Sequence, residues 1–93
     1  MDDAKKTVVD ALELARKRAE ECPTFGIYIS CVSQLEYLLD VLDGRQPIDR
    51  PKLRTIMIGH YGMREFEETD PQFSRALIEA QFVASKMGNG LKI

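Results

Sequence analysis

The residues of this 93-residue chain best suited to chemistry are its single histidine, His60, and the tyrosine that follows it, Tyr61. Such a pair on a helix can exchange protons, but catalysis also needs an orienting partner and a nucleophile or a metal. The chain has no second histidine, and no serine or cysteine motif lies near the pair. We therefore interpret His60 as a helix-face residue with structural contacts, and keep a small enzyme using His60 and Tyr61 as an alternative.

Two further kinds of chemical site are disfavoured by spacing. Cys22 and Cys31 match neither a zinc-binding nor a thioredoxin-type pattern, and Cys31 falls on an apolar helical stripe where a reduced thiol behaves as a small hydrophobic side chain. Gly88-Asn89-Gly90 follows a predicted helix, whereas a phosphate-binding loop would open one. We expect no catalytic residue, no metal and no cofactor.

Charged residues are sorted along the chain. The charged residues between positions 45 and 64 are mostly basic: Arg45, Arg50, Lys52, Arg54 and Arg64, with Asp49 as the acidic residue. Residues 65–70 carry only acidic charges, namely Glu65, Glu67, Glu68 and Asp70, and a second acidic edge comprises Glu36, Asp40 and Asp43. Opposed charge patches steer association with a partner. Acids ahead of a helix also complement its dipole, so the binding and structural explanations both stay open.

Three aromatic residues near these charges are candidate anchors for a partner: Tyr37, Tyr61 and Phe66. Tyr37 falls beside the main apolar stripe of its predicted helix, and tyrosine is enriched among residues that dominate interface energies. A half-buried tyrosine at the rim of the core is the competing interpretation of Tyr37.

Apolar spacing predicts four helical segments and no strand. The first carries a stripe from Ala4 to Ala19, and the break at Cys22-Pro23-Thr24 separates it from the second. The second has its stripe at Tyr28, Cys31, Leu35, Leu38 and Leu42. It ends at Asp43-Gly44, where Gly44 suits a left-handed cap.

The third segment has a clear start and an ambiguous end. Asp49 can cap it, with Pro51 tolerated in the first turn. Its apolar side would comprise Leu53, Ile56, Met57 and His60. Gly59 and Gly62 mark either a break or a close approach of another backbone, so this helix either stops near Gly59 or continues to Phe66.

The fourth segment has the clearest borders. Asp70 is placed to cap it ahead of Pro71, with Thr69 and Gln72 as a competing capping box. Its buried stripe is predicted to be Phe73, Leu77, Ala80, Val83, Ala84 and Met87. Gly88 should stop the helix, and the apolar Leu91 and Ile93 beyond it could fold back onto the bundle.

Length and composition favour a single domain, residues 1–93, with an all-α, compact, antiparallel bundle of about four helices. The net charge of −2 argues against a nucleic-acid partner, although a patch at 45–64 would predict steeply salt-dependent binding. No apolar run reaches the roughly 18 residues of a membrane span, and no secretory signal is recognisable. We expect a cytoplasmic protein without a membrane partner.

The last third of the chain carries a family resemblance. The run Glu65-Phe66-Glu67-Glu68-Thr69-Asp70-Pro71, then Ser74-Arg75-Ala76-Leu77, then Gly88 with Gly90-Leu91-Lys92, resembles the small helical immunity proteins of bacterial type VI secretion. More narrowly, it resembles the immunity protein that neutralises an NAD(P)+ glycohydrolase toxin. Weaker similarity covers Gln34, Leu35 and Tyr37 and the run Ile48-Asp49-Arg50, so the resemblance spans roughly residue 34 to the end.

The resemblance implies an all-helical cytoplasmic protein without catalytic activity, which binds a toxin domain and blocks its active site. Charge and aromatic placement suggest a toxin interface that contains Glu36, Tyr37, Asp40, Tyr61, Glu65, Glu67, Glu68 and Asp70. The alternative function is a helical adaptor or chaperone that binds secretion cargo without inhibiting it. A spare apolar stripe would also allow a homodimer of the free protein.

Overall fold

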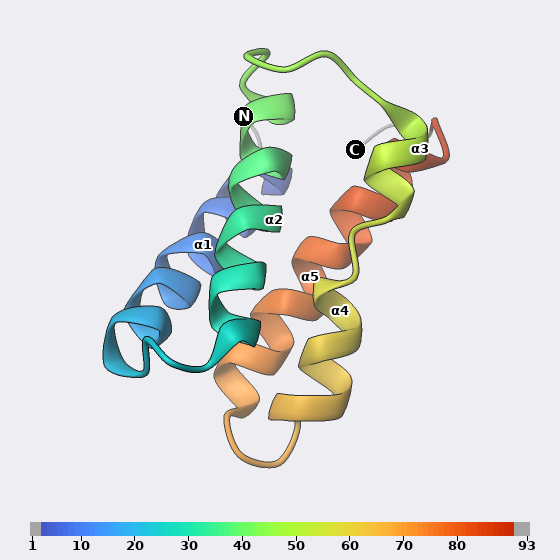
Figure 1. Ribbon diagram of the computed structural model, residues 1–93. Coiled ribbons are helices and arrows are strands. Elements are labelled where there is room, and N and C mark those ends of the chain that lie inside the picture. The colour runs from blue at the N-terminus through green and yellow to red at the C-terminus, as the bar shows by residue number, and fades with distance from the viewer. Residues whose placement is uncertain (1–2, 91–93) are drawn as a thin grey trace.

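The computed structural model describes residues 3–90, which form helices joined by short loops (Figure 1). The helices are α1 (Asp3–Glu21), α2 (Gly26–Leu42), α3 (Arg50–Arg54), α4 (Ile58–Tyr61), η1 (Gly62–Phe66) and α5 (Pro71–Gly88). Three are long, and η1 is a turn of π-helix that continues α4 directly. The described part of the chain contains no strand, which confirms the all-α expectation.

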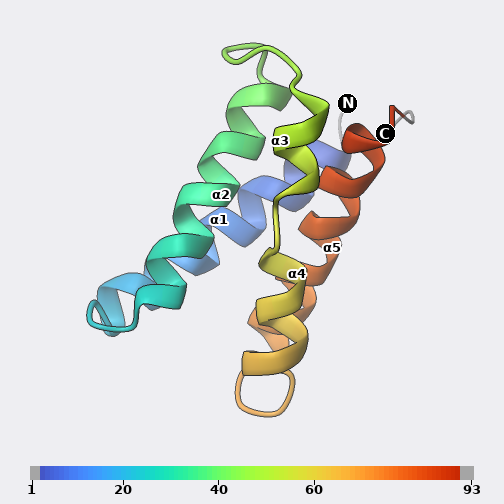
Figure 2. The ribbon, with the colours of Figure 1, turned by 45° about the vertical axis from the view of Figure 1, so that its right-hand side comes forward.

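The long helix α5 joins the two sides of the bundle. One of its sides packs against α1, which in turn packs antiparallel to α2, and another packs against α3, α4 and η1 (Figures 1 and 2). α2 and α4 contact each other only along a narrow strip. The helices α3, α4 and η1, which correspond to the third predicted segment, therefore pack mainly against α5.

The core follows the apolar stripes that the sequence predicts. All six stripe residues of α5 are buried, as are Val8, Ala11, Leu12 and Ala15 of α1 and Cys31, Leu35 and Leu38 of α2. Tyr28 and Leu42, at the two ends of the α2 stripe, are only partly buried. Burial of these side chains supplies the main favourable term in folding.

One predicted anchor for a partner belongs to the core instead. Phe66 is 3% exposed, and its ring stacks on Tyr28 with centroids 5.4 Å apart and lies 4.9 Å from the ring of Phe73. The η1 turn directs Phe66 inward between α2 and α5, so the prediction of an exposed anchor at this position is wrong.

The helix borders agree with the local signals. The Asp49 carboxylate accepts a hydrogen bond from the Lys52 N–H at 3.2 Å, and that of Asp70 accepts one from the Phe73 N–H at 3.4 Å. Thr69 takes no part in a capping box, because its hydroxyl donates to the Glu65 carbonyl oxygen. Gly44, after α2, has the expected positive φ of 79°. α5 ends at Gly88 as predicted, and the expected packing of Leu91 and Ile93 lies outside the described residues.

The third segment breaks earlier than either predicted position, at residues 55–57. The Thr55 hydroxyl donates to the Lys52 carbonyl oxygen at 2.6 Å and closes the end of α3. After the break, the Met57 N–H donates to Gln34 Oε1 at 2.8 Å, and the helix then runs through both glycines to residue 66. Met57 and His60 are exposed, so their placement on an apolar side is wrong; Ile58 is buried there instead.

Both glycines of the restarted helix lie close to α5. Of the two predicted explanations, a close approach of backbone holds at Gly62, whereas the neighbour of Gly59 is a side chain. A Cβ on Gly62 would lie 2.9 Å from the Ser74 carbonyl oxygen, and one on Gly59 would lie 2.7 Å from Gln81 Cγ. The buried Ser74 hydroxyl donates to the Gly62 carbonyl oxygen at 2.8 Å. This bond satisfies a backbone acceptor at the point where the α-helix widens into the π turn.

Candidate interaction surface

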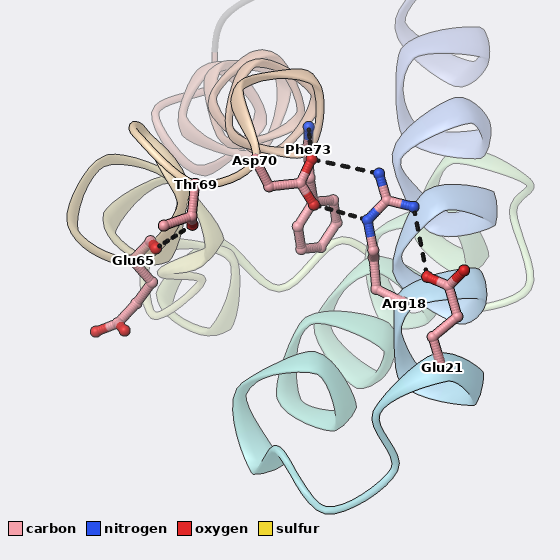
Figure 3. A network of polar contacts seen from close by, with 6 residues as sticks. All are labelled: Arg18, Glu21, Glu65, Thr69, Asp70 and Phe73. Atoms are coloured by element: carbon pink, nitrogen blue, oxygen red, sulfur yellow. Dashed lines mark hydrogen bonds and ion pairs between the residues drawn. The ribbon is translucent and has the colours of Figure 1, made fainter.

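Asp70 joins the start of α5 to α1 (Figure 3). Its Oδ2 accepts from Arg18 Nε at 2.7 Å and its Oδ1 from Arg18 Nη2 at 3.3 Å, and both side chains are only 19% exposed. The hydrogen bond from Arg18 holds the pKa of Asp70 below its usual value, and the Phe73 N–H adds to this effect while burial opposes it. The carboxylate is thus fully engaged within the fold.

The other acids of the same loop are unengaged. Glu65, Glu67 and Glu68 are exposed, and none forms an ion pair with any residue between 3 and 90. They form an acidic patch at the end of η1, at the opposite end of the α3–η1 segment from the basic α3 (Figure 1). Their carboxylates are therefore available to a positively charged partner.

The acids of α2 form exposed ion pairs with neighbouring elements. Glu36 Oε2 lies 3.0 Å from Arg16 Nη2 on α1, and Asp40 Oδ1 lies 3.8 Å from Arg45 Nη1 in the following loop. Pairs of this kind contribute about 0–1 kcal/mol to stability because water screens them. Both carboxylates can exchange these partners for others at little cost.

A chain of polar side chains connects α2 to α4. Gln34 accepts from the Met57 N–H and donates through Nε2 to Ser30 Oγ at 3.0 Å. Ser30 Oγ in turn lies 3.5 Å from the hydroxyl of the half-buried Tyr61. We call this strip between α2 and the α3–α4 segment the seam.

A cleft of about 330 Å³ opens at the α3 end of the seam. It is lined by Ser33, Gln34, Tyr37, Lys52, Thr55 and Ile56, and we call it the seam cleft. The Lys52 ammonium lies 4.2 Å from the centroid of the Tyr37 ring, within cation–π range. The Tyr37 hydroxyl is buried and has no hydrogen-bond partner in the part of the chain that the structure describes. Burial, followed by the charge of Asp49, raises the pKa of Tyr37 above its ordinary value.

A second hollow lies between α1 and α5. This α1–α5 groove, of about 720 Å³, is bordered by Ala4 and Thr7 on one side and by Ile78 and Phe82 on the other. Phe82 is 62% exposed, and the Lys86 ammonium lies 4.9 Å from its ring centroid. Sequence reasoning missed this groove, although an aromatic residue on the polar face of α5 was a visible signal for it.

Other reactive groups are dispersed. Burial raises the pKa of the Cys31 thiol to about 12, and Cys22 is exposed at the end of α1. Within residues 3–90, no three histidine, cysteine or acidic side chains gather in a way that could hold a metal ion. None of the described helices is both long and apolar enough to cross a membrane.

The comparison with protein families decides what this bundle is. A family model described as Tsi6 matches residues 3–86, which include nearly all of the described helices. The chain belongs to the Tsi6 family. The immune protein Tsi6 of Pseudomonas aeruginosa is 39% identical over 83 residues, which are 89% of this chain and 87% of the relative. Membership in the Tsi6 family confirms the resemblance to immunity proteins that the sequence indicated.

Solved structures extend the similarity to three dimensions. A chain in the structure of Tse6 in complex with Tsi6 matches with a TM-score of 0.88 and 36% identity, over 96% of this chain and 94% of that one. The structure of Tsi6 from Pseudomonas aeruginosa matches with a TM-score of 0.79 and 34% identity, over 87% of this chain and 93% of that one. The bundle described above is thus the Tsi6 fold.

The eight residues predicted for the interface lie in three places on this Tsi6-type bundle. Glu36, Tyr37 and Asp40 follow one edge of α2, Tyr61 lies in the seam, and Glu65, Glu67, Glu68 and Asp70 lie on η1 and the loop before α5. The structure brings the two tyrosines to the same seam from different helices. It also adds Gln34 and Lys52, which sequence reasoning did not select.

Proposed function

We propose that this protein is an immunity protein that binds a cognate secreted antibacterial toxin and inhibits it by occluding the active site. The observation that supports this most is the match over 96% of the chain to a structure of Tse6 in complex with Tsi6. The motif resemblance at residues 65–92 suggests that the toxin is an NAD(P)+ glycohydrolase. We further propose that the protein acts in the cytoplasm, where such a toxin would consume the NAD(P)+ of the cell that makes it.

Protection against such an enzyme requires tight binding, because a small free fraction of toxin would deplete the cofactor pool. Nanomolar affinity corresponds to about −12 kcal/mol. A partner contact of standard size covers about 800 Å² of each protein, and a preformed helical bundle orders few side chains on binding. A rigid bundle of the present size can provide such a surface.

The face that carries the seam is our proposed contact surface. Tyr37 and Tyr61 lie along it, and Met57, which is 45% exposed, lies at the break beside it. Aromatic residues and methionine are enriched in interfaces, and polar rims surround their centres. Here the basic α3 lies at one end of the face and the acidic patch of Glu65, Glu67 and Glu68 at the other. Glu36 and Asp40 extend the rim along α2.

Inhibition and charge steering can be tested together. The wild-type protein should form a one-to-one complex with the cognate toxin domain and abolish its NAD+ hydrolysis at stoichiometric concentration. Reversal of the acidic patch by Glu67→Lys and Glu68→Lys should slow association about tenfold or more at low salt and weaken protection. The matched control is Glu13→Lys with Glu20→Lys, which makes the same charge change at exposed positions of α1.

Two outcomes would contradict the proposal at different levels. A tight complex that hydrolyses NAD+ at the full rate would exclude inhibition and favour the adaptor function. An unchanged association rate for the patch variant, with full protection, would remove the acidic patch from the contact surface.

A further inference from the structure

Tyr37 lines the seam cleft, and its buried hydroxyl has no hydrogen-bond acceptor among the described residues. An unsatisfied buried hydroxyl destabilises a protein, and native structures contain few of them. Such a group is explained when another molecule supplies its missing acceptor.

We propose that the seam cleft receives an aspartate or glutamate side chain of the partner toxin, which accepts from the Tyr37 hydroxyl and pairs with the Lys52 ammonium. This inference rests on the proposed toxin binding and assigns chemistry to one part of the proposed contact surface. Lys52 is an exposed side chain lying over the Tyr37 ring, so it can swing toward an incoming carboxylate and uncover the ring.

The inventory of donors around the cleft favours a carboxylate. Lys52 forms no ion pair with any described residue, and Gln34 donates one of its two amide hydrogens to Ser30, leaving the other free. The Thr55 hydroxyl gives its only hydrogen to the Lys52 carbonyl oxygen and is therefore not available as a donor. An ionised carboxylate accepts hydrogen bonds and donates none, so it complements this set.

The negative charge that acts on the Tyr37 hydroxyl, that of Asp49, does not remove the preference for a carboxylate. Asp49 acts on Tyr37 through its charge, but its carboxylate accepts from the Lys52 backbone N–H as the cap of α3. Because the pKa of Tyr37 lies above its ordinary value, the hydroxyl keeps its proton at neutral pH and acts as a donor. The attraction of the Lys52 ammonium for the incoming carboxylate must then exceed the repulsion by Asp49. Binding of the carboxylate therefore needs Lys52 as much as it needs Tyr37.

The size of the cleft suits a side chain. A volume of about 330 Å³ is at the lower end of the range for small-molecule sites, which is roughly 300–1,000 Å³. The cleft also lies beside Met57, whose N–H donates to the lining residue Gln34, on the proposed contact surface. A carboxylate projecting from the surface of the partner fits this position.

The test uses the opposite effects that Tyr37→Phe should have on stability and on binding. Removal of the unpartnered hydroxyl should raise the Tm of the free protein by about 4 °C or more, while the affinity for the toxin domain should fall about tenfold to a hundredfold. Lys52→Met should weaken binding by a similar factor, and Lys52→Arg should retain most of it. The matched controls are Tyr28→Phe, in the aromatic core cluster, and Lys17→Met, on α1.

Calorimetric titration of wild-type protein into the toxin domain separates this inference from the proposed function. If wild-type protein binds and both Tyr37→Phe and Lys52→Met bind equally well, the carboxylate site is refuted and immunity stands. A lower Tm for Tyr37→Phe would also refute it, because the hydroxyl would then be stabilising the free fold. Absence of wild-type binding would refute the proposed function and this inference with it.

A charge-swap experiment identifies the carboxylate. Lys52→Glu should reduce affinity for the wild-type toxin at least a hundredfold, because two carboxylates would then face each other. One substitution of an acidic toxin residue by lysine should restore about tenfold or more of that loss. If no single acidic position of the toxin restores binding, the proposed pairing is wrong.

Discussion

The bond between Arg18 and Asp70 allows a quantitative test of how α1 and α5 are held together. Asp70→Asn keeps a good capping residue but removes the negative charge, whereas Asp70→Ala removes both the cap and the charge. A hydrogen bond to a charged group contributes about 1.5–3 kcal/mol. Because both side chains retain a 19% exposure, we expect a value near or slightly below the lower end of that range, about 1–2 kcal/mol, for Asp70→Asn.

The cap adds a smaller amount. Loss of a capping side chain costs about 0.5–2 kcal/mol, and the 3.4 Å bond to the Phe73 N–H is long, so about 0.5–1 kcal/mol is expected here. Asp70→Ala should therefore lower the free energy of unfolding by about 1.5–3 kcal/mol. In a domain of this size that corresponds to a fall in Tm of roughly 6–24 °C.

Urea unfolding followed by circular dichroism at several pH values gives the measurement. The folded-state pKa of Asp70 is depressed, so its contribution is complete above the unfolded value and is lost as pH falls through the lowered pKa. The gap between wild-type protein and Asp70→Asn should stay constant from about pH 7 to 5 and close below about pH 4. Arg18→Met in a double-mutant cycle should show a coupling of about 1–2 kcal/mol. A gap under about 0.5 kcal/mol at pH 7, or one that widens in acid, would refute the reasoning.

Two other predictions concern packing and thiol reactivity. Gly62→Ala should lower the free energy of unfolding by about 1–3 kcal/mol, because its Cβ would meet the Ser74 carbonyl oxygen at 2.9 Å. Gly26→Ala, which has nothing within 4 Å of the added Cβ, should instead be neutral or gain up to about 1 kcal/mol; equal losses at both glycines in urea unfolding would contradict the close approach. An aromatic disulfide reagent should titrate Cys22 rapidly in native protein and Cys31 only after unfolding, since burial raises the pKa of Cys31 to about 12. Fast reaction of both thiols in native protein would show that the core opens readily.

The sequence predicted the features that depend on neighbouring residues. The caps at Asp49 and Asp70, the left-handed Gly44 and the buried stripe of α5 follow from local preferences and from helical spacing, and all are present. The fold class followed from the same signals, because amphipathic helices joined by short loops pack as antiparallel neighbours. The resemblance to immunity proteins was recognised from the motif at residues 65–92, and local helix preferences did not indicate it.

Features decided by distant residues were not predicted. The break at 55–57 depends on Gln34, which lies 23 positions before Met57, and the role of Asp70 depends on Arg18, 52 positions away. Phe66 is buried because η1 winds as a π turn against Ser74, and nothing in its local sequence indicates that winding. At the candidate site, the tyrosines and acids were selected by residue type, but the position of Lys52 over the Tyr37 ring emerges only when the helices are placed together.

At the break before α4, two backbone N–H groups find their hydrogen-bond acceptors on different helices of the bundle. The Met57 N–H donates to Gln34 of α2, and the Gly59 N–H donates to Gln81 of α5. Deuterium uptake at these two positions therefore distinguishes separation of the segment from one neighbour or the other, because each amide loses its acceptor only when its own side opens. The amides of Met57 and Gly59, two positions apart in the chain, thus report independently on how this segment moves when a partner approaches.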